Sequence, residues 1–187
     1  MAQDEGSAAH LEELMVGYQN GNLDAFEGLF ATLAVPLRNY LTSLVRDLHR
    51  GEDLLQETFL QMHRSRHTYT PGRPVKPWAF GIARHVFLMY RRSAARRARH
   101  EGLAREDLPE IPVAGLAEFF PDREDLSKAL SGVPHDRREA LLLHHVWGFS
   151  FREIGNMLGV TERAAKLRAF RGMQNLRQTF GVKRGTP

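Results

Sequence analysis

The groups in this sequence best suited to chemistry are arginine and aromatic side chains, which bind phosphates and bases. Residues 77–100, PWAFGIARHVFLMYRRSAARRARH, contain a tryptophan and six arginines but no acidic residue. Arginine contacts with phosphates release counterions, and aromatic rings stack on unpaired bases. The segment is therefore suited to contact with a polyanion, and the cluster Arg91, Arg92, Arg96 and Arg97 would be the part that meets phosphate.

A second candidate site is a predicted helix-turn-helix near the C-terminus. Ser150 and Glu153 have the spacing of a capping box, Gly159 ends that helix, and Thr161 caps the next. Gly155 lets the two backbones approach, and the predicted contact residues are Ile154, Leu158, Val160 and Ala165. Two helices joined by so short a turn must cross steeply.

The second of these helices has a basic outer side. Its outward positions are expected to be Arg163, Lys166, Arg168 and Arg171, with a single acid, Glu162, in the first turn. Such a helix fits the major groove of DNA, where arginine pairs with guanine edges or with phosphates. This favours DNA binding over a helical hairpin that serves only for packing.

Several other classes of chemistry lack the residues they need. The chain has no cysteine, which removes disulfides, thiolate nucleophiles and thiolate zinc sites. No glycine-rich phosphate loop, G-x-S-x-G elbow or paired-carboxylate arrangement stands out. His63 and His67 are four residues apart but lack an H-E-x-x-H pattern, so no metal site is expected. We expect no catalytic residue, no cofactor and no enzyme activity.

Charge is segregated along the chain, although the net charge of its 187 residues is only +4. Residues 1–60 carry 10 acidic and 3 basic side chains, whereas residues 61–105 carry 1 acidic and 11 basic. Residues 106–153 are acidic overall, and residues 154–187 carry 7 basic side chains against 1 acidic. Two basic blocks indicate two contacts with a polyanion, while acidic blocks suit a basic protein surface. The alternative is that each block is a solvated helix face.

Helical periodicity dominates, and the alternation typical of strands is absent. One helix is predicted from Asp24, capped by Asp24 and Glu27 and kinked or restarted at Pro36. Other helices are predicted at 51–67, from Pro77, and at 122–131, 135–147, 150–158 and 161–179, with a loop at 68–77. The helix from Pro77 has a predicted apolar face of Ala79, Ile82, Ala83, Val86 and Tyr90.

These elements predict an all-α chain with two small helical domains, residues 1–96 and 122–187, joined by a flexible linker at 97–121. No run approaches the roughly 20 apolar residues of a membrane span, and nothing reads as a signal peptide. We therefore expect a cytoplasmic protein with no membrane contact of its own.

Several segments, taken in order, resemble one protein family. Residues 148–177, GFSFREIGNMLGVTERAAKLRAFRGMQNLR, resemble the promoter minus-thirty-five reading region of the extracytoplasmic-function (ECF) class of bacterial sigma factors. The segments FEGLFATLAVPLRNYLTSLVRD, GEDLLQETFLQMHR and PWAFGIARHVFLMYRRSAARR resemble successive parts of sigma region 2. Roughly the first twenty residues and the linker lie outside the resemblance.

The resemblance implies an alternative sigma factor that binds core RNA polymerase and directs promoter recognition, DNA melting and transcription initiation. It implies that the acidic second helix docks on polymerase through Glu52, Asp53, Leu54, Gln56 and Glu57. It implies that the basic third helix engages the melting minus-ten element through Trp78, Arg84, His85, Arg91, Arg92 and Arg96. Contact with the minus-thirty-five element falls to Arg163, Lys166, Arg168 and Arg171.

The family also suggests a loop and an inhibitor. Residues 66–76 align with the loop that pockets a flipped base, and Trp78 matches a tryptophan beside the opened bases, with a partly core position as the equal alternative. Gly81, His85 and Met89 depart from the usual pattern at the reading surface, so the base preference of better-known members does not carry over. The family implies an anti-sigma factor that covers the polymerase-binding surfaces.

Two other functions are compatible with parts of the sequence. A stand-alone DNA-binding regulator would explain the helix-turn-helix but not the docking motif or the arginine-rich helix. A basic helix lying on an anionic membrane would explain the first arginine cluster but not the second basic block.

Overall fold

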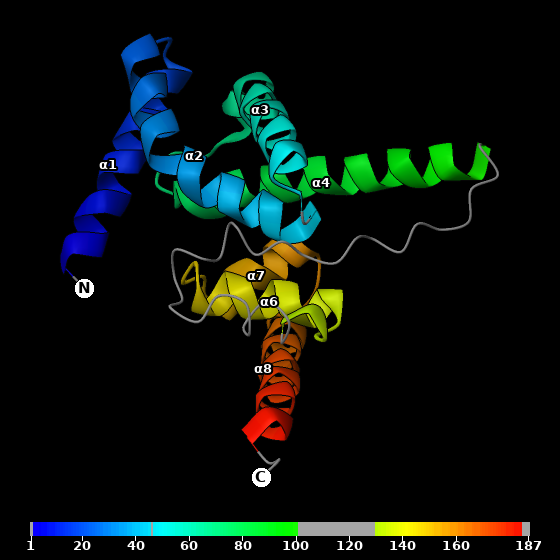
Figure 1. Cartoon of the computed structure of the whole chain (residues 1–187). Helices are drawn as coiled ribbons and strands as arrows, with labels where there is room; N and C mark the ends of the chain where they lie inside the picture. The colour runs from blue at the N-terminus through cyan, green and yellow to red at the C-terminus, as the bar shows by residue number, and fades with distance from the viewer. Residues whose placement is uncertain (1, 46, 101–129, 185–187) are drawn as a thin grey trace. The chain divides into compact units, whose positions relative to one another are not determined.

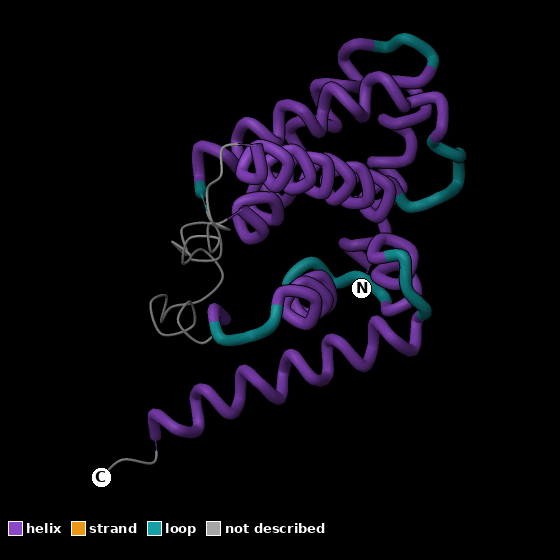
Figure 2. The backbone as a smooth tube through the Cα atoms, turned by 90° about the vertical axis from the view of Figure 1, so that its right-hand side faces the viewer, coloured by secondary structure: helices purple, strands orange, loops and turns teal. Residues whose placement is uncertain are grey.

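The computed structural model describes residues 2–45, 47–100 and 130–184, and every regular element in these ranges is helical (Figure 1, Figure 2). The chain divides into two compact units, Met1–Asp107 and Leu108–Pro187, each described here by itself. The predicted all-α class with two helical domains is confirmed for the described ranges. In the predicted linker, residues 97–100 are helical, and residues 101–121 lie outside the described part.

Unit 1 is a bundle of α1 (Ala2–Gln19), α2 (Leu23–Val45), α3 (Leu48–Ser65) and α4 (Val75–His100), with the short 3-10 helix η1 (Arg66–Thr68) after α3. Helices α2, α3 and α4 pack on one another, and α1 packs against α2 and α4. The most deeply buried side chains include Met15, Leu33, Leu37, Tyr40, Phe80 and Phe87. This core fixes α4 against the other helices.

Helix α1 was not predicted from the sequence. Its buried side chains Leu11, Met15 and Tyr18 are spaced by four and three residues, which places them on one helical face. That spacing was a readable signal within the acidic N-terminal segment. The structure therefore extends unit 1 to residues outside the family resemblance.

The predicted cap of α2 is wrong. The side-chain Oδ1 of Asn22 accepts hydrogen bonds from the backbone N–H groups of Asp24 and Ala25, at 3.0 and 3.3 Å. The helix therefore begins at Leu23, and Asp24 lies in its first turn. The helix also continues through Pro36 to Val45, so of the two outcomes predicted at this proline, a kink or a restart, the restart does not occur.

Helix α4 begins at Val75, two residues before the predicted start. Ala79 and Ala83 are buried as predicted, and the ring of Phe80, which the pattern did not assign, lies 5.1 Å from the ring of Tyr40 on α2. Figure 1 shows the C-terminal part of α4 extending past α2 and α3. The arginine-rich end of the helix is therefore not covered by those two helices.

Unit 2 contains α6 (His135–His145), α7 (Phe151–Leu158) and α8 (Glu162–Arg184). Its core includes the buried residues Leu130, Leu141 and Leu142, against which the half-buried Val146, Trp147, Met173 and Leu176 pack. The predicted helix at 122–131 falls mostly outside the described residues, and only residues 130 and 131 are seen to be helical. The three following helices were predicted to within a few residues, except that α8 continues to Arg184.

Candidate functional site

Helix α3 presents an acidic outer face. The carboxylate of Asp47 accepts a hydrogen bond from the backbone N–H of Arg50 at 3.0 Å, which caps the helix just before this face. Three predicted docking residues, Glu52, Asp53 and Gln56, are exposed on the first turns of α3. The carboxylates of Glu52 and Asp53 and the amide of Gln56 are therefore all accessible to a partner on this side of α3.

The two remaining predicted docking residues are less accessible. Leu54 is only 6% exposed, because it faces the core between α2, α3 and α4. Glu57 is half-buried, and its carboxylate accepts a hydrogen bond from the amide of Gln61 at 2.7 Å. The surface of the acidic face therefore consists mainly of Glu52, Asp53 and Gln56, and Leu54 belongs to the core beneath it.

Arg50 links the acidic face to α4. Its guanidinium lies 3.3 Å from the carboxylate of Asp53 and 5.3 Å from the centre of the Tyr90 ring on α4. Both side chains of the ion pair are about half exposed or more, so the pair itself adds little stability. Through these two contacts Arg50 connects Asp53 on α3 to Tyr90 on α4. The contact between Arg50 and Tyr90 could not be read from the sequence, because the two residues are distant in the chain.

Helix α4 carries an exposed stripe opposite its buried face. The stripe consists of residues three or four positions apart, His85, Met89, Arg92 and Arg96, all of which are exposed. Arg91 is also exposed, and its guanidinium lies 5.7 Å from the centre of the Phe87 ring. Arg84 is half-buried. The predicted minus-ten residues of the helix thus occupy one stripe and its border.

Trp78 lies at the N-terminal end of the same side of α4. It is half-buried, and its ring packs edge to face against the ring of Tyr69 with centroids 5.6 Å apart. The hydroxyl of the buried Tyr69 donates to the carbonyl of Arg73 at 2.5 Å, across the loop that leads into α4. A turn closes the tip of this loop, since the N–H of Arg73 donates to the carbonyl of Thr70 and Gly72 has a φ of 79°. Trp78 is therefore partly packed against Tyr69 and partly exposed.

In unit 2 the predicted helix-turn-helix is confirmed in detail. The Ser150 hydroxyl accepts from the N–H of Glu153 at 3.3 Å, and the Glu153 carboxylate accepts from the N–H of Ser150 at 2.8 Å. Gly159 ends α7 with a φ of 67°. The hydroxyl of Thr161 then accepts from the N–H of Ala164 at 3.2 Å and caps α8.

The crossing of α7 and α8 requires a glycine. A Cβ atom at Gly155 would lie 2.9 Å from the carbonyl oxygen of Val160, closer than side chains approach backbone. Ile154, Leu158 and Ala165 are buried where the two helices touch. The local caps and this close contact fix the direction of α8 relative to α7.

The predicted outer residues of α8 separate into two groups. Arg163, Lys166 and Arg171 are exposed. Arg168 is half-buried, and its guanidinium lies 3.6 Å from the carboxylate of Asp136 on α6. The first group is free to meet a ligand of unit 2, whereas Arg168 is turned toward the neighbouring helix.

Two apolar residues on α8 were not predicted as surface features. Leu167 is 45% exposed and Phe170 is 59% exposed, and both lie between basic residues of the outer side. Since the two are three positions apart, they are neighbours on the helix surface. Their exposure could not be inferred from hydropathy, which would place both in the core.

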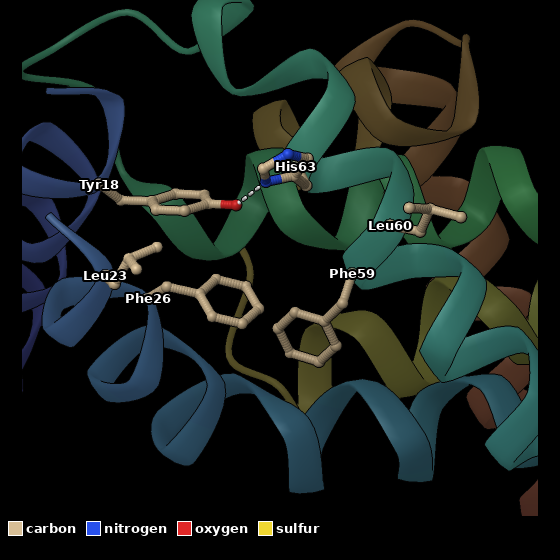
Figure 3. A pocket seen from close by; sticks show the side chains of 6 residues that line it. All are labelled: Tyr18, Leu23, Phe26, Phe59, Leu60 and His63. Atoms are coloured by element: carbon tan, nitrogen blue, oxygen red, sulfur yellow. Dashed lines mark hydrogen bonds between the residues drawn. The ribbon is translucent and has the colours of Figure 1, made fainter. Parts of the chain in front are cut away.

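An apolar groove lies in unit 1 between the end of α1, the start of α2 and the middle of α3. It has a volume of about 370 Å³ and is lined by Tyr18, Leu23, Phe26, Phe59, Leu60 and His63 (Figure 3). Leu23 and Leu60 are exposed at its edges, whereas Phe59 is buried. The rings of Phe26 and Phe59 meet edge to face with centroids 6.1 Å apart. The groove therefore has a packed aromatic floor.

The two tyrosines near the loop between η1 and α4 have raised pKa values. Burial raises the pKa of Tyr18, with the positive charge of Arg66 acting in the opposite direction. Burial, and then the negative charge of Glu12, raise the pKa of Tyr69. Both phenols keep their proton at neutral pH, as tyrosines ordinarily do, and can serve as hydrogen-bond donors.

The histidines of the described residues do not gather with acids around a common point. Within residues 2–45, 47–100 and 130–184 no three histidine, cysteine or acidic side chains form a group that could hold a metal ion. Nδ1 of His63 is hydrogen-bonded to the hydroxyl of Tyr18 at 2.5 Å, and the side chain of His67 is exposed. In the same ranges no helix is long and apolar enough to cross a lipid bilayer.

Comparison with known proteins finds a family match in each of the two units. Residues 29–97 match the Sigma-70 region 2 family, and residues 123–176 match the Sigma-70 region 4 family. The chain is 40% identical over 170 residues to RNA polymerase sigma factor CarQ of Myxococcus xanthus, covering 89% of this chain and 95% of CarQ. It is 31% identical over 145 residues to ECF RNA polymerase sigma factor SigM of Bacillus subtilis, covering 75% of this chain and 86% of SigM.

Solved structures show the same similarity. The sigma factor RpoE from Bartonella quintana, solved in complex with the anti-sigma factor NepR, matches with a TM-score of 0.72 and 27% identity. That match covers 86% of this chain and 99% of RpoE. CnrH, solved with the cytosolic domain of CnrY, shares the fold with a TM-score of 0.69 at 21% identity, over 92% of this chain and 98% of CnrH.

Proposed function

The chain belongs to the extracytoplasmic-function class of the sigma-70 family of bacterial RNA polymerase sigma factors, and from this premise we propose which surfaces carry its function. As an alternative sigma factor it binds core RNA polymerase and directs promoter recognition, DNA melting and transcription initiation. The observation that carries the proposal is the pair of exposed surfaces in unit 1, acidic on α3 and basic on α4.

The acidic face of α3 is proposed to dock on the polymerase. Glu52, Asp53 and Gln56 would make the contacts, because their side chains are exposed. Glu57 would contribute through its exposed part, and the buried Leu54 would hold the helix in place. Exposed carboxylates on a rigid helix suit a basic partner surface and speed its encounter.

The exposed stripe of α4 is proposed to bind the minus-ten element. Arg92 and Arg96 would contact phosphates, with Arg91 and Arg84 at the border of the stripe, while His85 and Trp78 would lie nearest to the opened bases. Unstacking a base costs a few kcal/mol, which an aromatic or pocket contact can offset. Apolar core, aromatic end and basic stripe thus have separate tasks on one helix.

Helix α8 is proposed to read the minus-thirty-five element. Arg163 and Lys166 lie in its first two turns and are exposed, so they can reach base edges or phosphates in the major groove. Arg171 would contact phosphate further along the helix. Arg168 would stay paired with Asp136 and would contact DNA only if this ion pair breaks on binding.

We further propose residues 1–96 and 122–187 as the two functional domains, with residues 97–121 as the linker. The protein would contribute no chemistry of its own, because nucleotide addition belongs to the polymerase, and no catalytic residue or cofactor is assigned. Its place would be the cytoplasm, where the polymerase acts. An anti-sigma factor would inhibit it, as suggested by the similarity to RpoE, which was solved with NepR.

The experiment that tests the function is run-off transcription with core polymerase and a library of genomic fragments. The expected result is initiation at a limited set of promoters that core polymerase alone does not use. Initiation at no promoter, with the protein folded and no inhibitor present, would contradict the proposal. Pull-down of core polymerase by the full chain separates a sigma factor from a stand-alone regulator, since a regulator has no reason to bind core enzyme.

A further inference from the structure

The side chain of Gln19, the last residue of α1, reaches across to the segment between η1 and α4. Its Nε2 group donates to the carbonyl of Arg66 at 2.7 Å and to the carbonyl of Tyr69 at 2.9 Å. The amide NH₂ has two N–H donors, and each meets one carbonyl. The two ends of η1 are thus tied to one side chain of a helix 47 and 50 residues earlier in the chain.

Tyr69 in turn contacts both the loop that leads into α4 and Trp78. The hydroxyl of Tyr69 donates to the carbonyl of Arg73, and its ring packs against the indole of Trp78 with centroids 5.6 Å apart. Tyr69 is only 3% exposed, and Gln19 binds the carbonyl of this same residue, so a shift of the backbone there would move a closely packed ring. A change at Gln19 should therefore reach both the loop tip and the indole.

A second contact from α1 supports the same segment. The hydroxyl of Tyr18 is hydrogen-bonded to Nδ1 of His63 at 2.5 Å, as Figure 3 shows. The guanidinium of Arg66 lies 6.0 Å from the centre of the Tyr18 ring. The last turn of α1 therefore contacts the end of α3, η1 and the start of the loop through side chains of adjacent residues.

We propose that Gln19 is a positioning residue for base recognition, because it fixes the loop of residues 66–76 and, through Tyr69, the ring of Trp78. The inference rests on the proposed function, which gives this loop and Trp78 the task of holding an opened base. Gln19 lies outside the stretch that matches sigma region 2, residues 29–97. It adds to that function a contribution from α1, whose last residue would set the geometry of the loop and of the Trp78 ring.

The chemistry of the contact predicts an order among substitutions. Gln19→Ala removes both donors and leaves two carbonyls without them. Gln19→Glu places a carboxylate against the same two carbonyls, so it should be worse than alanine. Gln19→Lys restores a donor of similar reach and should recover part of the function. Asn20→Ala, at the exposed next position, is the matched control.

One measurement tests whether Gln19 positions Trp78, and it requires neither promoter nor polymerase. The chain has two tryptophans, so the full-length Trp147→Phe variant leaves Trp78 as the only one. We expect acrylamide quenching of Trp78 fluorescence to rise in the order wild type, Gln19→Lys, Gln19→Ala, Gln19→Glu, with Asn20→Ala equal to wild type. Equal quenching in all five proteins would overturn the inference.

The second measurement tests recognition. A promoter that wild type uses in run-off transcription is mutated at each base of its minus-ten element, and initiation is compared for the preferred and the other bases. We expect Gln19→Ala to lose about tenfold in discrimination at one opened base, the effect of about one net hydrogen bond. Affinity for core polymerase should stay unchanged, and Gln19→Lys should regain part of the discrimination.

A loss of stability alone would give a different pattern. Leu11→Ala removes a side chain that is 2% exposed on α1, about two turns along the helix from Gln19, and should lower the melting temperature without changing base discrimination. If Leu11→Ala reduces discrimination as much as Gln19→Ala, or if Gln19→Ala matches Asn20→Ala, the inference is wrong. If wild type initiates at no promoter, the proposed function fails instead. The quenching measurements would still decide whether Gln19 positions Trp78.

Discussion

The guanidinium of Arg168 lies 3.6 Å from the carboxylate of Asp136, and this pair joins α8 to α6. The side chain of Arg168 is 34% exposed, whereas Arg163 and Lys166 on the same helix lie in the exposed class. Three basic residues that appear equivalent in sequence therefore have different surroundings. Arg168 must therefore break its ion pair with Asp136 before its guanidinium can bind DNA.

This difference predicts unequal effects on DNA binding. Arg163→Ala should weaken binding to a duplex with the minus-thirty-five element by about 1–3 kcal/mol, the typical value of a direct arginine contact. Arg168→Ala should weaken it less, because the side chain faces Asp136. Fluorescence anisotropy with the full chain measures both, and Asp136→Asn serves as the control that breaks the pair but keeps both DNA arginines. A larger loss for Arg168→Ala would mean that DNA binding breaks this pair.

The stripe of α4 predicts a change in salt dependence. Arg92→Ala should lower affinity for minus-ten DNA regardless of sequence and should reduce the slope of log affinity against log salt by about one. Met89→Ala is the matched control, because Met89 is an exposed, uncharged member of the same stripe. Its replacement should leave the slope unchanged. A slope that Arg92→Ala does not alter would remove this arginine from phosphate contact.

The acidic face of α3 predicts a separation of polymerase binding from stability. Asp53→Ala together with Gln56→Ala should reduce affinity for core polymerase while the melting temperature changes little, because both side chains are exposed. Leu54→Ala should instead destabilise unit 1 by about 2–5 kcal/mol, as buried leucines do. Binding assays and thermal unfolding of the same preparations distinguish the two. Unchanged polymerase affinity in the exposed variants would contradict the docking assignment.

Two helical glycines should respond to alanine in opposite ways. A Cβ at Gly172 of α8 would lie 2.8 Å from the carbonyl of Arg137 on α6, so Gly172→Ala should destabilise unit 2 by about 1–3 kcal/mol. A Cβ at Gly81 of α4 would meet nothing within 4 Å, so Gly81→Ala should stabilise its helix by about 0.5–1 kcal/mol. Urea unfolding of the two variants measures whether each change lowers or raises the free energy of unfolding. Stabilisation by Gly172→Ala would show that α6 and α8 can move apart at little cost.

The capping box of α7 makes a smaller, local prediction. Ser150→Ala should cost about 1 kcal/mol of unfolding free energy, because the N–H of Glu153 loses its acceptor. Glu153→Gln should cost less, since glutamine also serves in a capping box. Thermal unfolding of unit 2 in the full chain, followed by Trp147 fluorescence in a Trp78→Phe background, gives the comparison. Equal losses would show that the charge of Glu153 matters more than its hydrogen bond.

The helix-turn-helix was predictable because each of its signals acts over a few residues. Ser150 and Glu153 are three positions apart, and Gly159 and Thr161 lie on either side of a single residue. Hydrogen bonds of this range depend on local backbone geometry, which the residue types largely determine. The same logic failed at α2, where Asn22 rather than Asp24 provides the cap, because two suitable acceptors stand two positions apart and the chain could use either.

By itself, the sequence determined the helical class, the two groups of helices, the caps of the helix-turn-helix and the residue types available for binding phosphates and polymerase. Only the tertiary structure decided which of those residues are accessible. It buried Leu54, paired Arg168 with Asp136, exposed Leu167 and Phe170, and brought Gln19 to the carbonyls of Arg66 and Tyr69. The physical reason is that such contacts join residues about 30 to 50 positions apart, and helix packing, rather than local propensity, sets which side chains meet over that separation.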